Sequence, residues 1–107
     1  MAKHDSLDTE DKVRLLRSLA HHVHRKRPVD EVLMELVEQE LRGGRRRIYR
    51  AAAEKLAEDD PLGALQAIGA VGDEAACVLG PVLDSDDHRL ISNAINRLAD
   101  WQEANGS

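Results

Sequence analysis

The segment 28–44, PVDEVLMELVEQELRGG, decides the fold class of this sequence. Its apolar residues recur every three or four positions, which is the spacing of one face of an α-helix. Asp30 and Glu31 stand where a helix dipole favours negative charge, and Arg42 stands where it favours positive charge. A proline opens the segment and two glycines close it, so both ends carry helix-boundary signals. The segment predicts an amphipathic helix over about residues 29–42.

Similar apolar stripes fill the rest of the chain, and no segment alternates like a strand. They predict further helices over about residues 8–27, 45–58, 61–70, 73–83 and 86–103. The fold class that follows is all-α, a bundle of five to six short antiparallel helices, arranged as successive helix hairpins. The length of 107 residues is typical of one domain. We therefore expect a single helical-bundle domain over 1–107, with an ordered core at about 8–103.

Local signals mark several helix ends. Asp60 followed by Pro61 is typical of a helix start, with an N-cap and then a proline in the first turn. Gly80-Pro81 predicts a kink or a break in the fifth helix. Asp84 or Ser85 is expected to cap the last helix.

The core is expected to be aliphatic. Apolar residues make up 42% of the chain, but phenylalanine is absent and only Tyr49 and Trp101 are aromatic. Positions that share the helical period form the predicted core: Leu16, Leu19, Val23, Leu33, Leu36, Val37, Leu41, Leu56, Leu65, Ile68, Leu79, Ile91, Ile95 and Leu98. Cys77, the only cysteine, is predicted to be a buried thiol on the apolar side of the fifth helix.

Charge and segment length exclude several function classes. The net charge is −5, which disfavours nucleic-acid binding because such proteins need a basic surface. No apolar run approaches the roughly 20 residues that cross a bilayer, and the first residues lack the apolar core of a signal peptide. We therefore expect a cytoplasmic protein, with no nucleic acid as a partner and no membrane insertion by this chain.

No catalytic pattern is present. Neither a serine-nucleophile motif nor a phosphate-binding or dinucleotide-binding glycine motif occurs, so no catalytic residue, cofactor or enzymatic activity is expected. His21, His22 and His24 fit a metal site poorly, because structural zinc needs four ligands and no cysteine helps; a polar helix flank is the favoured interpretation. The acidic runs 58–60 and 84–87 lack the calcium-loop spacing, so helix capping is favoured there.

An arginine cluster is the first candidate partner-binding site. It surrounds the glycine pair and consists of Arg42, Arg45, Arg46, Arg47 and Arg50. Arginines at the start of a helix oppose its dipole, at a cost of about 0.3–1 kcal/mol each when unpaired. Two interpretations of the cluster remain open: a solvated face, and a binding site for an acidic protein surface. Arginine suits the binding site because its guanidinium can form two parallel hydrogen bonds with a carboxylate.

Replacing Arg46 and Arg47 with glutamate separates these two interpretations. If the cluster is the binding site, the double variant loses partner capture while its fold survives. Capture assays and thermal melts of both proteins measure this, and unchanged capture with an equal or higher melting temperature identifies the cluster as ordinary surface.

Trp101 is the second candidate partner-binding residue. Little sequence follows it, which favours an interface or a lid over a deep core position. Two arrangements remain open: a homodimer through the last helix, and a tryptophan that folds back onto the bundle. Light scattering across a concentration series distinguishes them by measuring the oligomeric state.

Three blocks resemble the cytoplasmic helical domain of the inner-membrane platform proteins of type II secretion and type IV pilus machines. They are 15–20 LLRSLA with 28–33 PVDEVL, 45–58 with 62–65 LGAL, and 94–101 AINRLADW. The family's glycine-glutamate turn before the last helix is replaced here by 83–87 LDSDD. The resemblance implies a six-helix scaffold that self-associates and meets a secretion-type ATPase or another assembly component.

The leading hypothesis is thus a non-enzymatic, protein-binding scaffold or adaptor domain. The alternative is a free-standing cytoplasmic helical regulator that binds one enzyme or complex. A third hypothesis is a small metal or anion sensor that uses the histidines near His21 or the arginines near Gly43.

Overall fold

The segment that predicts the fold most clearly forms α2, Val29–Arg42, with the bounds expected from its end signals. The computed structural model describes residues 8–44 and 46–105, and of Arg46 only the backbone. Within these residues all regular structure is helical. The other helices are α1 Thr9–His24, α3 Arg46–Ala57, α4 Pro61–Ala67, α5 Asp73–Leu83 and α6 His88–Asn105. The predicted all-α bundle of about six helices is confirmed.

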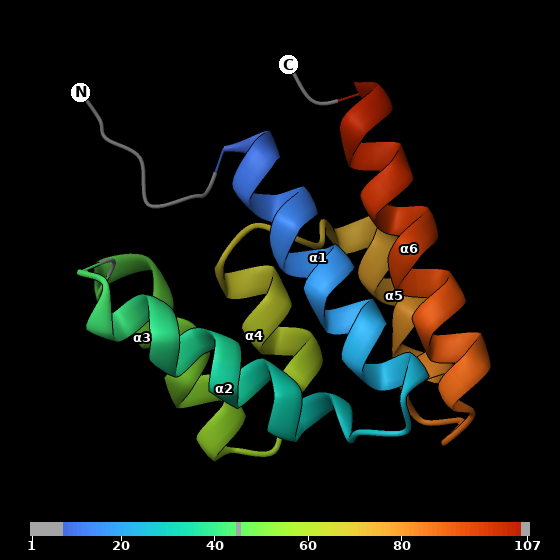
Figure 1. Ribbon diagram of the computed structural model, residues 1–107, viewed down its shortest axis with the longest axis horizontal. Coiled ribbons are helices and arrows are strands. Elements are labelled where there is room, and N and C mark those ends of the chain that lie inside the picture. Colours follow the sequence, from blue (N-terminus) through green and yellow to red (C-terminus); the bar gives the residue numbers. More distant parts are fainter. Residues whose placement is uncertain (1–7, 45, 106–107) are drawn as a thin grey trace.

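The helices of the described residues are arranged so that the last one, α6, lies beside the first one, α1 (Figure 1). Each helix packs against its neighbours in sequence, as successive hairpins require, and α6 returns to α1. This last pair is antiparallel and is the most extensive helix contact in the molecule. The predicted arrangement as successive helix hairpins did not include this contact between α1 and α6. It joins the first and last helices of the part of the chain that the structure describes.

Arg17 forms hydrogen bonds across the interface between α1 and α6. Its Nη2 donates to Asp100 Oδ1 at 2.7 Å and to Glu103 Oε1 at 2.6 Å, and its Nη1 donates to Asn96 Oδ1 at 3.3 Å. The hydrogen bonds to the two carboxylates raise the pKa of Arg17 above its usual value. Exposed ion pairs add little stability, so the stability of the α1–α6 interface comes mainly from the apolar residues beneath these ion pairs.

A second arginine closes the turn between α1 and α2. Helix α1 ends at His24, so the basic residues 25–27, which the sequence places inside the helix, form the connection instead. Lys26 turns the chain with a φ of 71°, and Arg27 then donates to Glu31 and Glu35. The hydrogen bond from Arg27 lowers the pKa of Glu35.

The helix caps follow the sequence signals in one case and depart from them in another. Asp60 is the N-cap of α4, as predicted, and its Oδ1 accepts from the backbone N of Gly63 at 2.8 Å. The cap of α6 was expected at Asp84 or Ser85, and this was wrong. Asp87 Oδ1 accepts from the backbone N of Arg89 and of Leu90, both at 3.1 Å.

The core is aliphatic, as the composition predicts. Of the fourteen predicted core residues, all but three are buried. The three exceptions are half-buried and pack against the core from its edge: Leu36, Leu41 and Leu98. Tyr49 and several alanines complete the interior, and the small residue Ala64 lets α4 lie close to its neighbours.

Helix α5 differs most from expectation. It continues through Pro81 to Leu83, so the predicted kink or break does not take the form of a break. Pro81 lies in the last turn and lacks the N–H that would donate to the carbonyl of Cys77. Cys77 is exposed, so the predicted buried thiol was wrong. The face that α5 buries carries Ala76 and Leu79, which leaves the apolar Val78 in solvent.

Candidate functional site

A groove with a volume of 740 Å³ separates α5 from α6. Its walls are largely apolar and come from facing sides of the two helices. They include Ala75 and Leu79 from α5, and Ala94 and Leu98 from α6. Helix α5 packs against α4, and α6 packs against α1, so each wall of the groove is supported by another helix of the bundle. The groove is therefore a supported concave surface with an apolar interior.

Two exposed apolar side chains border this groove. Within the described residues, three large apolar side chains lie in solvent: Val78 with 71% of its surface exposed, Trp101 with 58% and Leu90 with 46%. Val78 and Trp101 both line the groove, whereas Leu90 does not. A single exposed apolar residue is normal on a protein surface, but two beside one apolar groove are typical of a binding site.

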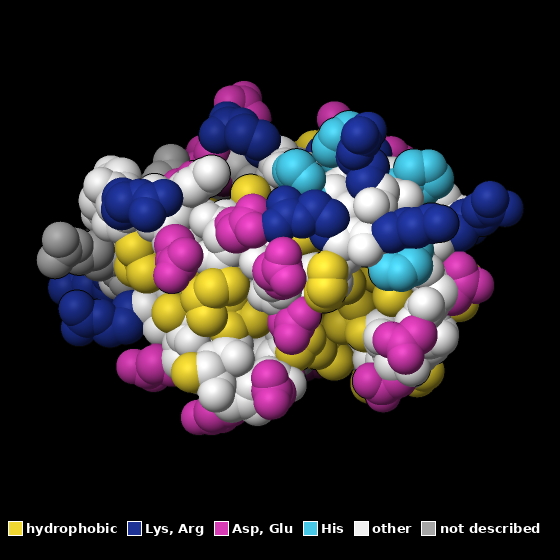
Figure 2. All heavy atoms as spheres, turned by 60° about the horizontal axis from the view of Figure 1, so that its bottom comes forward, with side chains coloured by type: hydrophobic (Ala, Val, Ile, Leu, Met, Phe, Trp, Pro, Cys, Tyr) yellow, Lys and Arg dark blue, Asp and Glu magenta, His cyan; other side chains and the backbone are white. Residues whose placement is uncertain are grey.

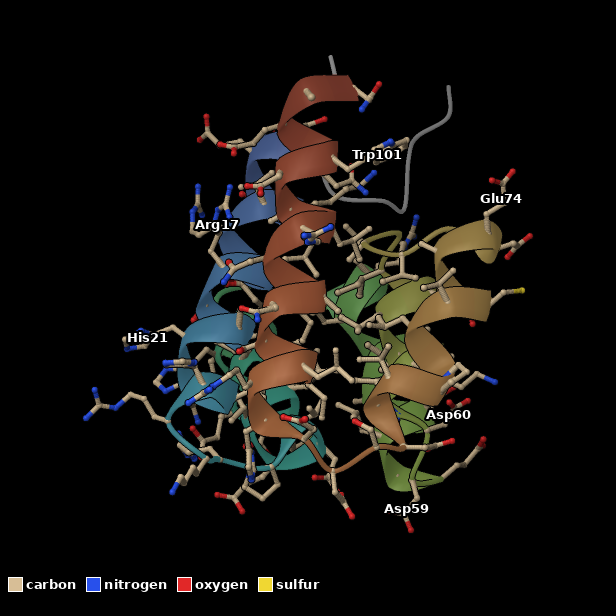
Figure 3. All side chains as sticks on the ribbon, turned by 90° about the vertical axis from the view of Figure 1, so that its right-hand side faces the viewer. Arg17, His21, Asp59, Asp60, Glu74 and Trp101 are labelled. Carbon is tan, nitrogen blue, oxygen red and sulfur yellow. The ribbon has the colours of Figure 1, made fainter. Side chains whose placement is uncertain are left out.

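Trp101 is the part of the site that the sequence predicted. Figure 3 shows it projecting from α6 near the same end of the bundle as Glu74, which lies in the first turn of α5. More than half of its surface is exposed, so it does not close the bundle as a lid. Tryptophan combines a large apolar area with few rotatable bonds, which suits an anchor in a protein interface.

Opposite charges stand on the two walls of the groove. Asp73 and Glu74 lie in the first turn of α5, and Arg97 lies on α6, one helical turn before Trp101. Among the residues that the structure describes, neither Glu74 nor Arg97 forms an ion pair or a side-chain hydrogen bond, and Asp73 only accepts from Gln66 Nε2 at 3.4 Å. The groove therefore offers a negative wall, an apolar centre and a positive wall to an incoming surface.

The arginine cluster lies at the corner between α2 and α3. The side chains of Arg42, Arg47 and Arg50 are exposed there. Arg46 begins α3, and no acidic residue occupies the first turn of that helix. Arg45 and the side chain of Arg46 lie outside the described residues. Arg47 has an interaction within the protein. The cluster is thus exposed in part, and it lies apart from the α5–α6 groove, none of whose lining residues it supplies.

The histidines gather with basic side chains at the end of α1. Figure 2 shows histidine side chains beside lysines and arginines on one part of the surface. His21 and His22 stack edge to face, with ring centroids 5.3 Å apart, and His24 Nδ1 lies 3.4 Å from Ser92 Oγ. Within residues 8–44 and 46–105, no three histidine, cysteine or acidic side chains come together in a way that can hold a metal ion.

Comparisons with protein-family models, curated proteins and solved structures found no match to this chain. In the part of the chain that the structure describes, no helix combines the length and the apolar character needed to cross a membrane.

Proposed function

We propose that this chain is a non-enzymatic protein-binding scaffold or adaptor domain, and that the α5–α6 groove receives an amphipathic helix of its partner. The observation that carries the proposal is the pairing of Val78 and Trp101, both exposed, beside one apolar groove. An apolar helix face can fill such a groove with side chains spaced three and four residues apart.

The charges on the walls specify the partner helix further. A basic residue on the partner can meet Asp73 and Glu74, and an acidic residue on its opposite flank can meet Arg97. Charge complementarity of this kind fixes orientation and excludes wrong partners more than it adds affinity. The expected occupant is therefore a helix with an apolar stripe between one basic and one acidic flank.

The resemblance to secretion and pilus platform domains agrees with a scaffold role in the cytoplasm. It also makes a component of such an assembly, including its ATPase, a candidate partner. The alternative is a free-standing regulator that uses the same groove to bind one enzyme. Identification of the captured partner decides between these two roles.

Trp101→Glu is expected to weaken partner binding at least about 30-fold, because it removes a central aromatic anchor and places a charge in an apolar groove. The experiment captures and identifies the partner, then measures the affinity of the purified partner for each variant. Leu90→Glu is the matched control, since Leu90 is an exposed apolar residue of α6 outside the groove. Equal affinities for wild type and Trp101→Glu, with both proteins folded, would show that the groove is not the binding site.

A further inference from the structure

We infer that the α5–α6 groove binds a second copy of this chain, placed by a two-fold axis so that Arg97 of each copy faces Glu74 of the other. This inference rests on the proposed function, because it names the partner of the same groove: α5 and α6 of the second copy supply the helical surface that the groove receives. It is carried by the charges and apolar side chains that line the two walls.

Other arginines of the chain form ion pairs within the same molecule, but Arg97 forms none with any described residue. Arg14, Arg17 and Arg27 each pair with acidic side chains of the same molecule. Arg97 and Glu74 line one groove, yet neither has an ion-pair partner within residues 8–44 and 46–105. The groove therefore keeps one positive and one negative group available for another molecule.

A two-fold interface uses the same surface on both copies, so each contact between two different residues occurs twice. A surface that carries both an acidic and a basic wall is self-complementary under this operation. The positive wall of one copy meets the negative wall of the other, and the reverse pair forms at the same time. A groove with charge of a single sign would repel its own copy.

Binding of the second copy also covers two exposed apolar side chains. Val78 lies on α5 one helical turn after Glu74, and Trp101 lies on α6 one helical turn after Arg97. Both line the groove and are the most exposed large apolar side chains of the described chain. Pairing the grooves covers both residues in both copies, next to the charged pairs. Burial of exposed apolar surface is the main favourable term in most protein association.

Charge reversal in the 107-residue chain tests this geometry. Arg97→Glu and Glu74→Arg each place like charges opposite one another twice in a homodimer. Each variant alone is expected to raise the dimer dissociation constant at least about tenfold, as seen for close charge pairs at interfaces. An equimolar mixture of the two variants is expected to dimerise again, because the mixed pair contains one Glu–Arg and one Arg–Glu contact.

Sedimentation equilibrium or light scattering across a concentration series measures these constants. Arg89→Glu is the matched control, since it makes the same charge change at an exposed position of α6 outside the groove. Glu74→Arg puts a positive charge at the start of α5, so a slightly lower melting temperature is expected for it. As a measurement without any mutation, the emission of Trp101 in the wild type is expected to shift to the blue as concentration rises.

The possible results are distinct. A wild type that stays monomeric at every concentration overturns the second-copy assignment, and so does a mixture that fails to restore the dimer. If such a monomer binds a different protein with an affinity that Trp101→Glu weakens, the proposed function stands without self-association. A dimer that is indifferent to both the charge reversals and Trp101→Glu overturns the second-copy assignment and leaves the groove without its proposed role.

Discussion

Leu33→Ala is expected to lower the free energy of unfolding by about 2–5 kcal/mol, the range found when buried leucines are truncated. Leu33 lies in α2 and is fully buried. Removing its branched end takes apolar surface out of the core and leaves a cavity that the surrounding helices fill only in part. Since small domains are stable by about 5–15 kcal/mol, the loss is a large share of the total. Urea unfolding followed by circular dichroism measures it.

Leu36→Ala is the matched control, on the same helix and with the same atoms removed. The periodicity of the sequence places Leu36 in the core and predicts the full 2–5 kcal/mol for it. In the structure Leu36 is half-buried and borders a surface hollow that Tyr49 also lines. A clearly smaller loss is therefore expected for Leu36→Ala. Equal losses for the two variants would contradict this distribution of burial.

The fold class and most of the core were predictable, because α2 and the helices around it separate apolar and polar residues clearly. In α2 a proline, charged end turns and a glycine pair mark both boundaries. At the start of α6 the sequence offers a run of side chains that can all cap a helix. The choice of Asp87 over Asp84 depends on where the helix must begin in order to reach α1, which is not a local property.

The buried face of α5 was not predictable from its periodicity. Ala75, Ala76, Cys77, Val78 and Leu79 follow one another, so almost every side of the helix is apolar. A helical period cannot identify the buried face when the opposite face is also apolar. Tertiary packing selects Ala76 and Leu79, and the exposure of Val78 follows from that choice.

The candidate site was predicted only through Trp101. Trp101 was predicted as a candidate interface residue, and the structure leaves this side chain exposed on α6. Glu74 and Arg97 carried no signal, because a single charged residue on a helix is ordinary. They form part of one site only when α5 and α6 are brought side by side, which requires the fold.

Gln102 connects the groove to the body of the protein. It is one of two buried polar residues among those described, and its Nε2 donates to the backbone oxygen of Ala70 at 3.2 Å. Ala70 belongs to the connection between α4 and α5, where Ile68 and Val71 are also buried. This hydrogen bond therefore holds the connection before α5 against α6, and Gln102 also lines the groove.

Gln102→Leu is expected to lower the free energy of unfolding by about 1–3 kcal/mol, because the leucine keeps much of the volume but leaves the buried Ala70 carbonyl without its donor. Gln66→Leu is the matched control. Gln66 is exposed and its only side-chain hydrogen bond to a described residue, to Asp73, is long at 3.4 Å, so a change within about 0.5 kcal/mol is expected. Urea unfolding of the two variants measures the difference. Wild-type stability in Gln102→Leu would mean that the Ala70 carbonyl finds another donor and that the α4–α5 connection does not depend on Gln102.

Loss of this hydrogen bond also leaves α5 held less firmly against α6. Gln102→Leu is therefore expected to weaken binding in the groove, whereas Gln66→Leu leaves binding unchanged.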